Sequence, residues 1–126
     1  MSLLYKVSAI ISHFDPVQKT RYIARPCNRT IIDTDQMSRI IAERSTLSRA
    51  DIAATLYAFE ELIPELLLQN YSLHLKPLGI FSLSFKSKTE DDAEKVNAGS
   101  ISEIKLQFRP DTKLKKEINK AKLQKG

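Results

Sequence analysis

The chain has 126 residues, of which 42% are hydrophobic and 28% are charged, and this composition excludes a disordered protein and predicts one folded domain with a short appendage. A net charge of +5 favours a polyanion as the partner. No apolar run approaches the roughly 20 residues of a membrane-spanning helix, and the shortage of Gly and absence of Trp argue against a phosphate loop or a cofactor box.

The first 32 residues are expected to form a β-hairpin. Leu3–Ile11 alternates between apolar and polar side chains, which is typical of a half-buried strand, and Phe14-Asp15-Pro16 has the composition of a turn. A second extended run, Lys19–Arg25, ends at a proline. The single cysteine, Cys27, cannot form an internal disulfide, so we interpret it as a small buried side chain in a reducing cytoplasm. We expect no secretory signal at the start of the chain.

Two helices are expected next, joined by a short turn. Asp33 or Thr34 can cap a short helix over about 35–45, and Ser48 can cap a second helix. The second helix has an apolar stripe with spacings of three and four residues throughout. The stripe consists of Ile52, Leu56, Phe59, Ile63, Leu66 and Leu67.

The hydrophobic period then changes to two, which predicts a long β-arm over roughly Ser72–Phe108. Within it we expect a strand over 71–76, a turn at Pro77-Leu78-Gly79, and strands over 80–86 and 101–108. Between the last two strands lies a polar stretch, 89–94, with four acidic residues. A final helix is expected from Thr112 to Lys122, and its few apolar residues imply that it docks on another element.

Positive charge is concentrated at both ends of the chain. Residues 1–32 sum to +4, residues 33–85 to −3 and residues 86–126 to +4. An uneven basic surface of this kind favours a polyanion partner, although lysines that only maintain solubility would give a similar sum.

The order of these elements from Asp33 to Ile118 resembles the HU/IHF family of histone-like DNA-binding proteins. The resemblance rests on Leu47-Ser48-Arg49 at the start of the second helix, Leu78-Gly79-Ile80-Phe81 at the strand turn, and Phe108–Lys115 at the closing strand and helix. It implies an α+β fold with a DNA-binding domain over 33–126, and residues 1–32 fit a variant branch with an N-terminal β-hairpin extension.

The resemblance also implies an intertwined homodimer that holds double-stranded DNA across a saddle and between two arms. The apolar stripe and strand faces present more apolar surface than two short helices cover, so we expect part of the core to lie between two chains. The expected dimer core is Leu56, Phe59, Ile63, Phe81, Leu83, Phe85 and Phe108.

Several lysines match basic positions of the family. Lys86 and Lys88 lie on the outgoing arm and Lys115 on the closing helix, while Lys113 can substitute for a family lysine where this chain has Thr112. Charge and position add Lys105, Arg109 and Lys116 to the expected DNA-binding residues. The family's arm tip is basic and carries an intercalating proline, but Thr89–Ser100 has neither feature. We therefore expect phosphate contacts with little sequence specificity and weak or no intercalative bending.

Two other classes of function remain as alternatives. An enzyme or a metal protein would need clustered ligands or catalytic groups, whereas His13 and His74 are the only histidines and have no spaced partner. We therefore expect no catalytic activity, no cofactor, no metal and no small-molecule substrate. The other alternative is a protein–protein scaffold that keeps the HU fold with reduced DNA affinity. The favoured interpretation is a nucleoid-associated DNA-binding protein of the cytoplasm.

Overall fold

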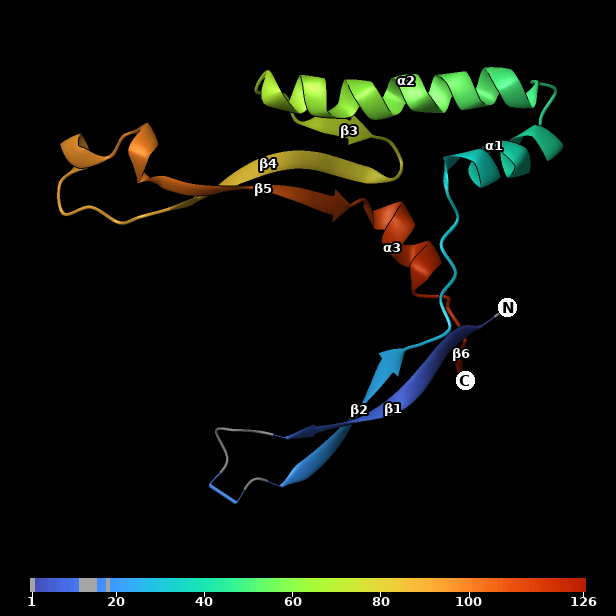
Figure 1. Cartoon of the computed structure of the whole chain (residues 1–126), viewed down its shortest axis with the longest axis horizontal. Helices are drawn as coiled ribbons and strands as arrows, with labels where there is room; N and C mark the ends of the chain where they lie inside the picture. The colour runs from blue at the N-terminus through green and yellow to red at the C-terminus, as the bar shows by residue number, and fades with distance from the viewer. Residues whose placement is uncertain (1, 12–15, 18) are drawn as a thin grey trace. The chain divides into compact units, whose positions relative to one another are not determined.

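The computed structural model describes residues 2–11, 16–17 and 19–126 of the chain (Figure 1). The chain forms two compact units, one of residues 1–32 together with 117–126 and the other of residues 33–116. Within the described residues, three α-helices and two three-stranded sheets give a mixed α+β fold, as the sequence predicts.

The N-terminal unit is a three-stranded sheet. β1 (Leu3–Ile11) pairs with β2 (Thr20–Pro26) in a continuous antiparallel register, which confirms both expected strands of the hairpin. Of the expected turn, Phe14 and Asp15 lie outside the described residues. Alternating apolar side chains in β1 favour this extended structure because a period of two places them all on one face.

The third strand of this sheet corrects the expected C-terminus. We expected a helix over Thr112–Lys122, but α3 (Thr112–Ile118) is shorter and β6 (Leu123–Lys125) follows it. β6 pairs parallel with β1, and the Leu3 N–H donates to the carbonyl of Lys122 at 2.8 Å. A helix with so few apolar positions gains little from packing, whereas the open edge of β1 offers backbone hydrogen bonds.

The second unit begins with a helical hairpin. α1 (Thr34–Glu43) starts at the N-cap Asp33, whose side chain and that of Gln36 each accept a backbone N–H of the other residue. α2 (Arg49–Leu68) starts at the N-cap Ser48, so both expected caps are confirmed. These caps satisfy backbone N–H groups that a helix start leaves without partners.

Polar contacts between side chains tie α1 to α2. The Tyr57 hydroxyl donates to the Asp35 carboxylate at 2.9 Å, and the Thr34 hydroxyl donates to Glu60 at 2.5 Å. The hydrogen bond to Asp35, together with the charge of that carboxylate, raises the pKa of Tyr57 above 10.0. The neutral phenol is therefore the form that the folded chain stabilises.

A second sheet follows α2 in the strand order β3-β4-β5. It consists of β3 (Leu73–Leu75), β4 (Gly79–Ser87) and β5 (Ile101–Pro110), and all neighbours are antiparallel. β4 and β5 extend as a two-stranded arm, with the short 3₁₀ helices η1 (Ala93–Lys95) and η2 (Ala98–Ser100) at its tip, while α2 runs alongside β3 and β4 (Figure 1).

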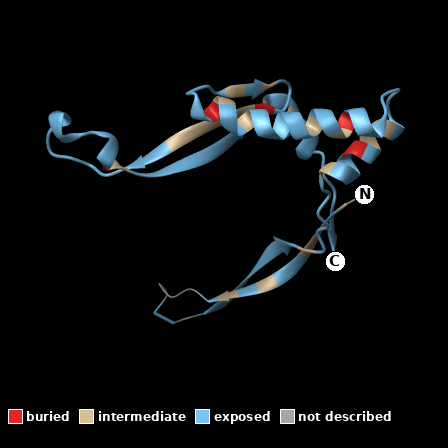
Figure 2. Ribbon diagram, turned by 45° about the horizontal axis from the view of Figure 1, so that its top comes forward, coloured by how far each residue is buried: buried red, intermediate tan, exposed pale blue. Residues whose placement is uncertain are grey.

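Few apolar side chains are buried within one chain. Among the described residues, only Ile52 and Leu67 are buried hydrophobic side chains, at 5% and 6% exposure (Figure 2). The expected dimer-core residues divide into half-buried and exposed side chains. Leu56, Ile63, Phe81 and Leu83 are half-buried, whereas Phe59, Phe85 and Phe108 are exposed. A single copy of the chain thus leaves most of its large apolar side chains in contact with water.

Candidate nucleic-acid interface

The β4–β5 arm has one apolar and one polar face, which its strand register defines. Phe81 lies opposite Phe108, Leu83 opposite Leu106, and Phe85 opposite Ile104. Because side chains of directly opposed residues project to the same side, these six residues form one face, which we name the apolar arm face. The rings of Phe81 and Phe108 are in contact, with centroids 4.8 Å apart. The opposite side carries the intervening residues and is the polar arm face.

Three of the expected DNA-binding cations lie on the polar arm face. Lys86 and Lys105 are diagonal neighbours, because Lys105 lies opposite Ser84, two residues before Lys86. Arg109 lies on the same face, four residues along β5 from Lys105, which corresponds to about 13 Å of extended strand. The register thus places a line of cations on this side of the arm.

One acidic residue that sequence reasoning missed lies among these cations. Glu103 is directly opposite Lys86, and its carboxylate is 4.0 Å from the ammonium group of Lys105. Both partners of that ion pair are about half exposed, so the pair contributes little stability and can exchange for a phosphate. Strand alternation alone could have placed Glu103 on the same face as Lys105.

The other four expected cations lie next to the arm and after it. Lys88 follows β4, and its backbone N–H donates to the Ser100 carbonyl at 2.8 Å. Lys113, Lys115 and Lys116 lie on α3, and all four side chains are exposed. They are therefore accessible to a partner in the isolated chain.

His74 lies at the base of the same sheet and has a structural contact. Its Nε2 is 2.8 Å from the Asp111 carboxylate, so the pair links β3 to the residue before α3. No group of three or more potential metal ligands occurs among the residues that the structure describes, and the expected candidate His13 lies outside them. None of the described helices combines the length and apolar character needed to cross a bilayer.

The arm tip is acidic and contains the 3₁₀ helices η1 and η2. Glu90, Asp91, Asp92 and Glu94 are all exposed. Asn97 caps η2 through a hydrogen bond from the Gly99 N–H at 2.8 Å, and Ser100 is buried at 3% exposure. The tip therefore presents carboxylates that would repel a phosphate backbone.

The N-terminal sheet carries further cations to which sequence reasoning assigned no role. Lys6 lies directly opposite Arg25, and Arg21 projects to the same side of β2 as Arg25, four residues earlier in the strand. We name these three residues the basic sheet face. The reverse side of the same sheet carries mainly apolar side chains. They are Leu3, Tyr5, Val7, Ala9, Ile11, Tyr22, Ala24, Pro26 and Leu123.

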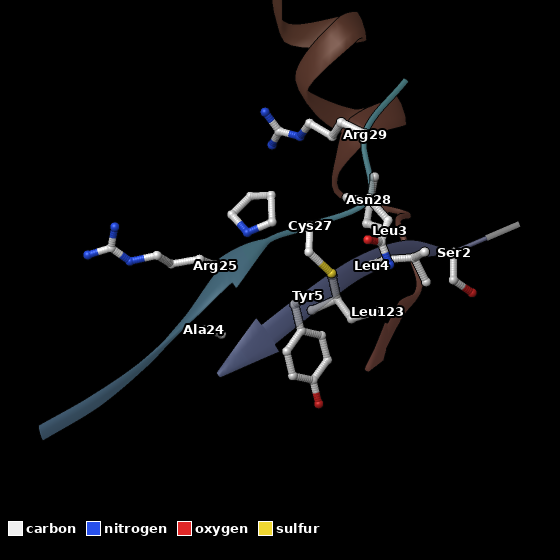
Figure 3. Close-up of a pocket in the computed structure, with 11 residues that line it drawn as sticks. Ser2, Leu3, Leu4, Tyr5, Ala24, Arg25, Cys27, Asn28, Arg29 and Leu123 are labelled. Atoms are coloured by element: carbon white, nitrogen blue, oxygen red, sulfur yellow. The ribbon is translucent and has the colours of Figure 1, made fainter. Parts of the chain in front are cut away.

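An open groove of about 710 Å³ lies at one end of this sheet. Leu4, Cys27 and Leu123 are among the residues that line it, and Cys27 is half-buried rather than fully buried as expected. Arg25 and Arg29 also line the groove and extend to one side of it, whereas Tyr5 points away from them (Figure 3). Arg25 belongs to the basic sheet face, so Arg29 is the residue that adds positive charge next to that face.

Comparisons with known proteins agree on one kind of domain. A family model described as an HU domain fused to a winged helix–turn–helix, Ig or glycine-rich motif matches residues 1–125. The fold is similar to a crystal structure of a candidate bacterial DNA-binding protein from Bacteroides vulgatus, with a TM-score of 0.65 and 16% sequence identity. The match covers 99% of this chain and 49% of that protein, so the chain spans about half of its length. No curated protein matches the chain in sequence.

Proposed function

The chain belongs to the family of HU domains fused to other motifs, and from this premise we propose that it binds double-stranded DNA as a homodimer, without catalytic activity. The contacts would be made to phosphates with little reading of base sequence, which is the mode in which DNA affinity depends most strongly on salt. A nucleoid-associated protein is the class that this mode of binding fits.

The observation that carries the proposal is the division of the arm into two faces. Lys86, Lys105 and Arg109 lie on one side of β4 and β5, and the six residues of the apolar arm face lie on the other. A partner that covers the apolar arm face would leave the cations accessible. Lysine and arginine on a strand can then neutralise phosphates without a further loss of backbone conformational entropy.

The exposed apolar surface supports the proposed homodimer. On the apolar arm face, Phe85 and Leu106 are each 62% exposed, although their neighbours across the strands are also apolar. Beside it, an apolar groove of about 260 Å³ lies between α2 and β3, lined in part by Phe59, Ile63 and Leu73. A second copy carries the same two surfaces, so a two-fold symmetric interface would bury apolar side chains of both chains.

The acidic tip limits what the arm can do to DNA. Thr89–Ser100 contains no proline, and four carboxylates are exposed there. Insertion of the tip between base pairs would bring these carboxylates close to phosphates at an electrostatic cost. We infer that the duplex is bound at the root of the arm and stays nearly straight.

Binding to a random-sequence duplex across a range of salt concentrations tests the proposal. The logarithm of affinity should fall linearly with the logarithm of salt concentration, with a slope of about −0.9 for each phosphate contacted. A slope of zero would contradict phosphate binding. Energy transfer between dyes at the two duplex ends should change little on binding, and a strong increase would contradict a nearly straight duplex.

A triple substitution tests the assigned cations. Replacing Lys86, Lys88 and Lys115 with Gln should make the salt slope shallower by about 2–3 because three phosphate contacts are lost. The matched control replaces the exposed cations Arg39, Arg44 and Lys76, to which no DNA contact is assigned, and should keep the original slope. Unchanged affinity in the triple variant would show that Lys86, Lys88 and Lys115 do not contact DNA.

A protein–protein scaffold is the second candidate. β2 is an edge strand in the order β2-β1-β6, so its outer backbone groups can pair with another chain. This function would leave the salt slope for DNA at zero and give a protein complex in its place.

A further inference from the structure

The net positive charge of the chain comes from its N-terminal unit, the smaller of the two. Residues 1–32 and 117–126 carry eight basic side chains and two acidic ones, whereas residues 33–116 carry twelve basic and thirteen acidic side chains. The N-terminal unit therefore has a net charge of +6 and the second unit, residues 33–116, a net charge of −1. Attraction of a polyanion over distance depends on such sums, so the small unit provides most of it.

We propose that the basic sheet face, formed by Lys6, Arg21 and Arg25, is a second binding surface for the phosphate backbone of duplex DNA. The inference rests on the proposed function, and it adds a site outside the arm. It concerns contacts made by the N-terminal sheet, to which neither the fold nor the family description assigns a ligand.

The register provides the first reason. Lys6 and Arg25 are directly opposed on neighbouring strands, a placement in which like charges repel and destabilise a sheet. Neither side chain has a carboxylate partner among the described residues, and both are exposed. A phosphate bound between them would replace this repulsion with two charge-assisted contacts.

The geometry of β2 provides the second reason. Arg21 and Arg25 are four residues apart on one strand, which separates their backbone positions by about 13 Å. That distance equals the axial rise of about four base pairs at about 3.4 Å each. β2 thus holds the two cations at a spacing that suits two separate phosphates along one DNA strand.

The reverse side of the sheet provides the third reason. It carries mainly apolar side chains, of which Leu3, Val7 and Tyr22 are exposed, so this is the side suited to packing against protein. The basic sheet face would then remain in water and available to DNA. Alternation along β1 and β2 places all three cations on one side, which they share with Leu4, Ile10 and Ile23.

The main experiment replaces Lys6, Arg21 and Arg25 with Gln in the full chain and measures binding to a random-sequence duplex as a function of salt. We expect the slope to become shallower by about 2–3 and the affinity at about 0.1 M salt to fall by about 100-fold. The control replaces Arg39, Arg44 and Lys76, which removes the same charge from the second unit and should leave the slope unchanged.

The outcomes separate this inference from the proposed function. If the wild-type chain shows a salt slope and the triple variant retains it in full, the basic sheet face is not a DNA-binding surface, while the proposed function stands. If the wild-type chain shows no slope, the proposed function itself fails. A shallower slope in the triple variant alone supports the second surface.

A single substitution distinguishes a lost DNA contact from unfolding of the sheet. Lys6→Glu places a carboxylate opposite Arg25, so the cross-strand pair becomes attractive and the sheet should be at least as stable as in the wild type. DNA affinity should nevertheless fall at least 10-fold at about 0.1 M salt, because one phosphate contact is lost and a repulsive charge is added. Amide exchange in β1 measures the sheet, and unchanged DNA affinity with an intact sheet would overturn the inference.

Discussion

Phe85 offers the sharpest test of the proposed dimer. Its side chain is 62% exposed in the single chain, although it lies opposite Ile104 on the apolar arm face. If a second copy covers this face, Phe85→Ala removes a large contact from each of the two chains. If the chain is a monomer, the same substitution changes only an exposed side chain and has little effect on stability.

The magnitude follows from the exposed area. An aromatic residue has about 200 Å² to bury, and 62% of that is about 120 Å². At about 25 cal/mol per Å², burying this area stabilises the complex by about 3 kcal/mol for each chain, or up to about 6 kcal/mol for a symmetric dimer. Because each 1.4 kcal/mol is a factor of ten, the dimer dissociation constant should rise by up to about 10⁴-fold.

Sedimentation equilibrium over a wide range of protein concentrations measures this effect directly. The wild-type chain should be a dimer, and its melting temperature should rise with concentration because mass action favours the dimer over separate chains. Phe85→Ala should sediment as a monomer or unfold at a lower temperature. Val96→Ala is the matched control, since Val96 is also exposed, at 54%, but lies at the arm tip.

Two results would refute this reasoning. One is a wild-type chain that sediments as a monomer with a concentration-independent melting temperature. The other is a Phe85→Ala variant that dimerises as tightly as the Val96→Ala control. Either result would mean that a second copy does not cover the apolar arm face.

Substitutions at three further positions test the fold itself. Gly79→Ala should destabilise the chain by about 1–3 kcal/mol in urea unfolding, since the added methyl group would overlap the carbonyl oxygen of Arg109. Ser48→Ala should lower the unfolding free energy by about 0.5–2 kcal/mol because α2 loses its N-cap, whereas Ser48→Asp should retain it. The raised pKa of Tyr57 predicts stability that is present below pH 10 and lost as pH rises through the folded-state pKa. Asp35→Asn should return the Tyr57 pKa toward 10.0 in an ultraviolet titration, and an unchanged titration would contradict the assigned hydrogen bond.

Local patterns predicted most of the fold. Alternation in β1 and the capping residues Asp33 and Ser48 are properties of neighbouring residues, so they could be interpreted from the sequence alone. β6 could not, because three residues at the C-terminus have no period of their own. Their extended structure depends on pairing with β1, which is more than a hundred residues away in the sequence.

The candidate site depended on register in the same way. The sequence identified Lys86 and Lys105 as cations of the arm, but not the fact that Glu103 lies opposite Lys86. Register is a property of two strands together, and a shift of one residue would have moved every side chain to the other face. The net charge of the N-terminal unit likewise became clear only when residues 117–126 were assigned to it.

Dimerisation and DNA binding should be coupled, which gives a last prediction. A dimer presents two copies of each basic face, so a chain that remains monomeric can contact only half as many phosphates. Phe85→Ala removes no charge, yet its salt slope at concentrations where it is a folded monomer should fall to about half of the wild-type value. A full slope in that monomer would show that one copy makes every phosphate contact, and the exposed apolar arm face would then have to be explained by a partner other than a second copy.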